Sequence, residues 1–313
     1  MKSLFPLTSA LALICTSYLA ICNLATAQTT TPTDSSQPAS PAVATAKSSP
    51  ELQALLENIY LTWRQAMNSK DFNTWTATTA ASRQMATRNR IISQRLSYPK
   101  ALFSTPVQAP PLAQLVLLDV LEKGDTANAI YYGKVDFGLG ADQTITDNFM
   151  VLKFVKELGL WKFDQLRIIK TGNDPDLQNK IRTSDFSFLK SDVFQPSGLA
   201  PLIAKSVNPP AYLAELWIAA NGFDVRVNIN QGNHKSHITN DDGRDLVIGG
   251  LVKGKNTVSL SITPVATQST LPKRLEVAIY ATPAANKPAK RIFHYAPDIN
   301  KVPRTYSVTI PIH

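Results

Sequence analysis

Cysteine is almost absent from this chain. Of its 313 residues only two are cysteines, Cys15 and Cys22, and both lie near the N-terminus. The rest of the chain therefore has no thiolate nucleophile, no cysteine-based metal site and no disulfide. A chain of this length without disulfides must be held together by its hydrophobic core.

Other scarcities exclude whole classes of protein. With 13 glycines and no triplet period the chain is not collagen-like, and 44% hydrophobic residues exclude a wholly disordered chain. A single long apolar stretch, at the extreme N-terminus, excludes a protein that crosses a membrane many times. The length predicts roughly two domains.

Histidine and the common catalytic motifs are also scarce. All four histidines lie beyond residue 230, and no nucleophile elbow, phosphate loop or dinucleotide fingerprint is present. His234 and His237 lie in a turn-and-strand context, where residues three apart point to opposite faces. The acidic run 240–245 lacks the ligand spacing of a calcium loop and reads as a turn. We therefore expect no metal site and no cofactor.

The net charge of +9 is spread along the chain. The densest basic cluster comprises Arg83, Arg88, Arg90 and Arg95, whose spacings cannot place all four on one face of a helix. This pattern favours a solvated helix surface, and we expect no nucleic-acid partner.

The N-terminus has the organisation of a secretory signal. Lys2 precedes an apolar run over residues 4–25, and Ala25-Thr26-Ala27 is a small-x-small cleavage site. We expect cleavage after Ala27 and export, most simply to the periplasm of a Gram-negative bacterium, where a disulfide-free protein of this size fits. The alternative is a chain anchored in the membrane by residues 4–25. Isoleucine before each cysteine argues against lipidation.

Residues 28–49 consist mainly of threonine, serine, proline and alanine and predict a flexible linker. A helix then begins within residues 48–51, either with Ser48 and Glu51 as a capping box or with Ser49 as the cap and Pro50 in the first helical position. Apolar residues follow at spacings of three and four as far as Met67. A short helical piece over 71–75 and a third helix over 79–96 come next. Four strand-like runs follow at 114–122, 126–137, 144–157 and 160–169, which predicts an α+β domain.

Several residues in this region resemble the nuclear transport factor 2-like superfamily. They are Trp63-Arg64 in the first helix, Lys70-Asp71-Phe72 with Trp75, and the hairpin 154–163 with its Gly159-Leu160-Trp161-Lys162 sequence. The resemblance covers about residues 50–170 and implies three N-terminal helices on a curved antiparallel sheet that forms a cone. It also implies a small apolar ligand in the cone and a homodimer through the face of the sheet.

Residues 171–210 predict a linker, and residues 211–313 change to a period of two. Val225, Val227 and Ile229 alternate with polar residues, and Asn221-Gly222 before them is a hairpin-turn signal. About seven short strands predict a β-sandwich domain with only a loose likeness to accessory domains. This alternation places Trp217 and Tyr212 in the core of that sandwich.

The candidate catalytic group is Asp119, which lies in an otherwise apolar strand, where burial would raise the pKa of a carboxyl group. Tyr131 or Tyr132 could assist it, because one of them must face inward. The candidate lining of a ligand pocket comprises Trp63, Trp75, Phe103, Phe154 and Trp161. For each set the alternative is an ordinary structural role, an edge or paired position for Asp119 and plain core for the aromatic residues.

Three functions follow from this reading. The first is a non-catalytic ligand-binding or protein-interaction module of the cell envelope, with a protein or glycan partner. The second is an enzyme that uses Asp119 and a tyrosine for proton transfer or hydrolysis. The third is a carbohydrate-binding protein that uses Trp217 and Tyr212 if they are exposed. The sequence favours a protein without catalytic activity, and membrane contact is expected only through an uncleaved signal.

Overall fold

The structure is a computed structural model that describes residues 20–22, 49–104, 108–137, 147–171, 174–266 and 272–312. The predicted signal peptide and the linker 28–49 lie almost entirely outside these residues. The described chain divides into two compact units. The helix–sheet unit falls within Cys15–Arg83 and Thr105–Leu202, and the barrel unit within Gln84–Ser104 and Ile203–His313. None of the described helices has the length and apolar character needed to cross a membrane.

The first helix, α1 (Pro50–Ser69), begins where the sequence predicts. The hydroxyl of Ser49 accepts the backbone N–H of Leu52, and Pro50 occupies the first turn, where a backbone N–H is not needed. The helix ends at Lys70, which has a left-handed conformation with a φ of 59°. Asp71 then caps the short helix α2 (Phe72–Thr78) by accepting two backbone N–H groups.

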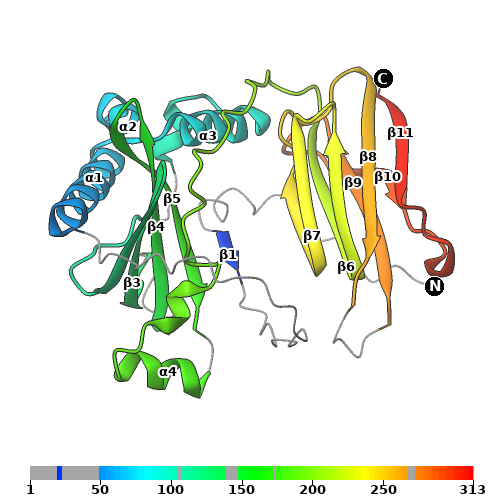
Figure 1. The fold of residues 1–313 in the computed structure, drawn as a ribbon. Coiled ribbons are helices and arrows are strands. Elements are labelled where there is room, and N and C mark those ends of the chain that lie inside the picture. The colour runs from blue at the N-terminus through cyan, green and yellow to red at the C-terminus, as the bar shows by residue number, and fades with distance from the viewer. Residues whose placement is uncertain are drawn as a thin grey trace. The chain divides into compact units, whose positions relative to one another are not determined.

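The first sheet has the strand order β1-β5-β4-β3-β2. Its antiparallel strands are β2 (Val116–Lys123), β3 (Thr126–Lys134), β4 (Asp147–Glu157) and β5 (Leu160–Lys170). The short β1 (Ala20–Cys22) pairs in parallel with β5. Figure 1 shows α1 lying along one face of this sheet.

Both faces of the first sheet are covered. Under α1, the side chains of Leu56 and Tyr60 are fully buried against apolar residues of all four antiparallel strands. On the opposite face, Leu189 and Phe194 pack against Ile130 and Phe149. The covering segment includes helix α4 (Pro175–Arg182) and the 3-10 helix η3 (Ser187–Lys190), so the residues predicted as a linker carry helices and part of this core.

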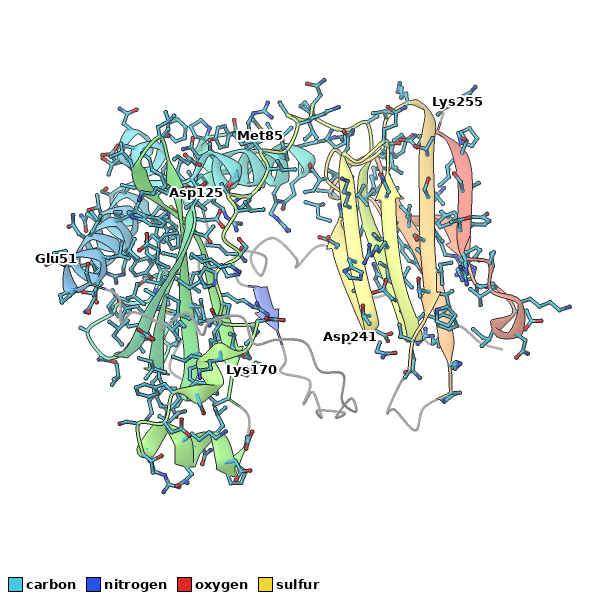
Figure 2. All side chains as sticks on the ribbon, viewed as in Figure 1. Glu51, Met85, Asp125, Lys170, Asp241 and Lys255 are labelled. Carbon is cyan, nitrogen blue, oxygen red and sulfur yellow. The ribbon has the colours of Figure 1, made fainter. Side chains whose placement is uncertain are left out.

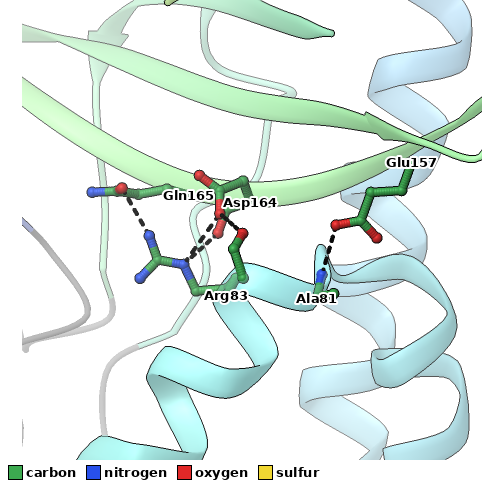
Figure 3. Close-up of polar contacts among 6 residues, drawn as sticks. Ala81, Arg83, Glu157, Asp164 and Gln165 are labelled. Atoms are coloured by element: carbon green, nitrogen blue, oxygen red, sulfur yellow. Dashed lines mark hydrogen bonds and ion pairs between the residues drawn. The ribbon is translucent and has the colours of Figure 1, made fainter. Parts of the chain in front are cut away.

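Helix α3 (Ala81–Ser93) begins against the first sheet (Figure 3). The Glu157 carboxylate accepts the backbone N–H of Ala81 at 2.8 Å. The Arg83 guanidinium donates to the Asp164 carbonyl at 2.6 Å and to the Gln165 side chain at 2.7 Å. Burial raises the pKa of Asp164, and the charge of Arg83 offsets part of this effect.

The later residues of α3 belong to the barrel unit. The buried amide of Asn89 donates to the carbonyl of Lys205 at 2.7 Å and accepts the N–H of Val207 at 3.1 Å. The hydroxyl of Ser93 accepts the N–H of Gly249 at 2.7 Å. The 3-10 helix η2 (Lys100–Phe103) follows. These bonds satisfy buried backbone groups, so α3 is part of the barrel unit's structure and not a free basic face.

The second sheet is built around one long strand, β6 (Leu213–Ile229). Its order is β10-β9-β6-β8-β11, with β7 also paired to β6. The first half of β6 pairs with β9 and the second half with β8, so the sheet curls into a nearly closed barrel around one core. The other strands are β7 (His234–Leu246), β8 (Gly254–Pro264), β9 (Arg274–Thr282), β10 (Lys290–Tyr295) and β11 (Thr305–Ile312), with the 3-10 helix η4 (Ile299–Lys301) before β11.

Asn221-Gly222 is not the hairpin turn that the sequence predicts. It lies inside β6, at an irregularity of the pairing with β7 between Ala220 and Asp224. Gly222 has a φ of +82°, which a β-carbon would disfavour, and this local bend passes β6 from one neighbour to the other. An Asn-Gly pair, which favours a two-residue hairpin turn, therefore forms a β-bulge here.

The predicted fold class is wrong in two respects. Helices are not confined to the N-terminal part, because α4 follows the first sheet. The C-terminal strands form one curled sheet instead of the two separate sheets of a sandwich. The single curled sheet arises because the long strand β6 pairs with β9 in its first half and with β8 in its second half. Period-two alternation in the sequence does not reveal such a change of partner.

Candidate functional site

The first sheet separates Asp119 from one of its two candidate tyrosine partners, Tyr131. Asp119 pairs with Ile130, whose side chain lies in the core beneath Phe194, whereas Tyr131 lies in the core beneath α1. Asp119 and Tyr131 therefore occupy opposite faces of the sheet. One oxygen of Asp119 accepts the backbone N–H of Val120 at 2.8 Å. Tyr132 packs against Phe149 on the Asp119 face, with ring centroids 5.4 Å apart.

Tyr131 has a different carboxylate partner, which the sequence analysis did not consider. Its hydroxyl donates to Glu57 of α1 at 2.9 Å, and the same Glu57 oxygen accepts the amide of Gln53 at 3.1 Å. Burial and the nearby Glu57 charge raise the pKa of Tyr131 far above its ordinary value. Tyr131 therefore stays protonated and fastens the helix to the sheet.

The predicted pocket lining is distributed over separate places. Trp63 and Phe154 both pack on Phe163, with centroids 4.4 and 5.8 Å apart, in the core beneath α1. Trp161 is buried in the same core, and the ammonium of Lys156 lies 5.3 Å from its ring centroid. The two remaining members lie elsewhere: Trp75 stacks on Phe72, and Phe103 belongs to η2 of the barrel unit.

A hollow lies on the outer face of the barrel unit instead. Its floor includes two small buried residues, Ala219 of β6 and Ala278 of β9. Trp217 pairs with Arg244 on one side and Ala278 on the other, which sets these side chains in one row across the sheet. The hollow has a volume of about 220 Å³, and its lining is completed by Ile218, Asp242, Gly243, Glu276 and Tyr280.

Trp217 is held in place from several sides. Its ring nitrogen donates to the Glu215 carboxylate at 2.6 Å, and the Arg244 guanidinium lies 3.8 Å from its ring centroid. The Tyr280 ring lies 5.0 Å away at 47°. The two aromatic residues are half-buried on the outer face of the sheet, so they form a fixed apolar wall that solvent can reach.

The opposite wall of the hollow is acidic, and its charges are paired. Glu276 lies 3.0 Å from both Arg274 and His294, and Asp242 lies 3.9 Å from Arg274. Burial alone would raise the pKa of Glu276, but the hydrogen bonds from Arg274 and His294 outweigh it and lower that pKa. Glu276 is therefore ionised at neutral pH. Asp241, labelled in Figure 2, precedes Asp242 within β7.

A second, wider groove of about 790 Å³ lies over the other half of the same sheet. Its outward side chains are hydroxyls and cations, among them Arg226, Lys235 and Ser307. His237 also lines it, but this ring lies 2.5 Å from Asp224, whose pKa the hydrogen bonds from Thr239 and His237 lower. This groove is open, and the aromatic side chain in its lining, Tyr306, packs against the barrel core.

His234 and His237, which share a possible metal-site spacing, do not meet. His234 is buried at the start of β7, where it accepts the N–H of Ile248, while His237 is exposed beside Asp224. Within the part of the chain that the structure describes, no group of three or more histidine, cysteine, aspartate or glutamate residues could hold a metal ion.

The prediction that Trp217 and Tyr212 both enter the core is half wrong. Tyr212 packs against the barrel core, but Trp217 points away from it. In the second half of β6 the odd-numbered residues are buried, and the bulge at Gly222 reverses this, so that the even-numbered residues are buried in the first half. Only the position of the bulge reveals the exposure of Trp217.

In comparisons with known proteins, no family model, curated protein or solved structure matches the chain. The resemblance of residues 50–170 to the nuclear transport factor 2-like superfamily stays a prediction.

Proposed function

We propose that this protein is an exported binding protein without catalytic activity that holds a saccharide in the hollow formed by Trp217, Tyr280, Arg244, Asp242 and Glu276. The observation that carries the proposal is the fixed, solvent-accessible pair of aromatic rings opposite a polar wall. A sugar ring has apolar C–H faces and a polar edge of hydroxyl groups. An aromatic wall facing carboxylates and a guanidinium matches both parts.

The charge of the site favours a neutral ligand. The carboxylates of Glu276 and Asp242 face Arg274, and Glu276 also faces His294, so little net charge is left to attract an ion. Ionised carboxylates and a guanidinium are strong hydrogen-bonding partners for hydroxyl groups. A polyhydroxyl compound therefore suits this lining better than an inorganic anion or a metal ion.

The size of the hollow favours a single ring. Its volume of about 220 Å³ exceeds the roughly 30 Å³ occupied by a water molecule and lies below the roughly 300–1,000 Å³ of pockets for drug-sized ligands. One residue of a longer glycan fits this range while its neighbours remain in solvent. Export, which the N-terminal segment predicts, would bring the site to the polysaccharides of the cell envelope.

A glycan array with the purified chain tests this function. We expect a reproducible signal for a group of glycans that share one terminal or internal sugar. Trp217→Ala should lower that signal at least about tenfold, because it removes the apolar wall against which the ring packs. Circular dichroism and thermal unfolding should show that the variant still folds.

The matched controls are two arginine variants of the same sheet. Arg244→Ala should weaken binding because Arg244 lines the hollow and supports Trp217, whereas Arg226→Ala, in the wider groove, should leave it unchanged. An array without a glycan signal would refute the proposal. A signal that Trp217→Ala leaves intact and Arg226→Ala abolishes would move the site to the wider groove.

A further inference from the structure

The hairpin between β4 and β5 ends in two leucines that face solvent. Leu158 is 104% exposed and Leu160 is 64% exposed. The two strands continue beyond their neighbour, because β3 begins at Thr126 opposite Val155. Figure 1 shows this hairpin, drawn in green, reaching past the sheet beside α2.

Leu158 occupies a position that disfavours leucine. It forms a two-residue turn with Gly159 between the paired residues Glu157 and Leu160, and both turn residues have positive φ, 50° and 81°. Such turns favour Asn-Gly, because asparagine tolerates the left-handed region better than residues with larger aliphatic side chains. Leu158 therefore combines backbone strain with complete exposure, and folding gives no reason for either.

The base of the hairpin is firmly attached to the helices. Glu157 accepts the N–H of Ala81 at 2.8 Å, as Figure 3 shows, and the ammonium of Lys162 donates to the carbonyl of Ala77. The N–H of Ala80 donates to the carbonyl of Phe163 at 2.8 Å. The leucines thus stand on a supported stem, and their exposure is a property of an ordered hairpin.

The size of the tip argues for a lipid partner over a protein partner. Burying a leucine side chain removes on the order of 100 Å² of apolar surface, so the tip offers roughly 200 Å². A stable protein interface needs about 800 Å² from each partner. Insertion of two aliphatic side chains between lipids needs no larger complementary surface and gives weak, reversible attachment.

The charges near the tip fit a bilayer that contains anionic lipids. Lys156 and Lys162 flank the turn on its two strands, and the one carboxylate among residues 156–162, Glu157, points to the N-terminus of α3. The chain as a whole carries a net charge of +9. We propose that the hairpin tip, Leu158 to Leu160, inserts into the surface of an anionic lipid bilayer. This proposal is independent of the saccharide site.

A fluorophore at the tip tests the insertion in the full chain. In a chain with Cys15→Ser and Cys22→Ser, a nitrobenzoxadiazole group is attached at Leu160→Cys or, as a control, at Leu55→Cys. Leu55 is an exposed leucine on α1 of the same unit. With vesicles of phosphatidylglycerol and phosphatidylethanolamine we expect a brighter, blue-shifted emission at residue 160 and an unchanged emission at residue 55. Vesicles of phosphatidylcholine should give a weaker change.

Leu158→Asn in the chain labelled at residue 160 removes the most exposed apolar side chain of the tip. It should therefore raise the vesicle concentration that gives half of the maximal emission change by about tenfold or more. This variant suits the turn, so it should not unfold the protein. The proposal fails if vesicles do not change the emission at residue 160 or change the emission at residue 55 equally. It also fails if Leu158→Asn leaves the vesicle concentration for the half-maximal emission change unaltered. A change that follows protein concentration without vesicles would also refute it and indicate contact between copies.

Discussion

The two units place their aromatic residues in opposite ways. Beneath α1, Tyr60, Trp63 and Phe163 pack against one another in a core that closes the helix-covered face of the sheet. On the barrel unit, Trp217 and Tyr280 stand on the outer face, beside a hollow floored by alanines. The face that the sequence offered as a candidate pocket thus holds a packed core, and Trp217, which the alternation assigned to a core, borders a hollow.

This difference shows what aromatic residues need in order to form a site. Phe163 is core because α1 covers its face of the sheet with Tyr60 and Trp63. Trp217 forms a wall because it lies on the outer face, away from the barrel core, with the small Ala278 beside it. Ala219 and Ala278 create the space that Trp217 and Tyr280 enclose. A search for binding sites should therefore ask which residues are small as well as which are aromatic.

The largest expected effect lies in the filled core. Phe163→Ala should reduce the free energy of unfolding of the helix–sheet unit by about 3–5 kcal/mol, because it leaves a cavity among Tyr60, Trp63 and Phe154. Trp217→Ala, which removes an even larger side chain, should cost only about 1 kcal/mol, close to the value of its contact with Arg244. Urea unfolding of both variants measures the difference. Equal losses would contradict the contrast between core and wall.

A smaller effect is expected in the pH dependence of stability, to which the carboxylates of Asp164 and Glu276 should contribute in opposite ways. The folded-state pKa of Asp164 is raised by burial, so its contribution to stability is largest below the unfolded pKa of about 3.9 and declines as pH rises through the folded pKa. The folded-state pKa of Glu276 is lowered, so its contribution is present above about 4.3 and is lost as pH falls through the folded pKa.

Asp164→Asn and Glu276→Gln should therefore change the pH dependence of unfolding in opposite directions. The first should remove a loss of stability on raising the pH, and the second should remove a loss on lowering it. Urea unfolding at intervals between about pH 3 and 7 provides the measurement. Trp217 reports on the barrel unit, and the other three tryptophans report on the helix–sheet unit. Changes of the same sign in both variants would show that the two environments are alike.

Local signals in the sequence predicted local structure well. Ser49 and Pro50 start α1, and the glycine-containing hairpin 157–160 forms as expected. Which face of the sheet each residue of β6 occupies was not predictable from the sequence. One bulge at Gly222 divides this 17-residue strand into two halves with opposite patterns of buried residues. The pairing of Tyr131 with Glu57 was equally hidden, because it joins residues 74 positions apart that no local pattern connects.

Fluorine NMR of the chain labelled with 5-fluorotryptophan compares the two regions in one experiment. The chain has four tryptophans, so Trp63, Trp75, Trp161 and Trp217 give resonances that single Trp→Phe variants assign. Titration with cellotetraose, maltotetraose and tetra-N-acetylchitotetraose should shift the resonance of Trp217 with at least one of these sugars and leave the other three unchanged. A shift confined to Trp63 or Trp161, or no shift with any of the sugars, would contradict the assignment of the site to the barrel unit.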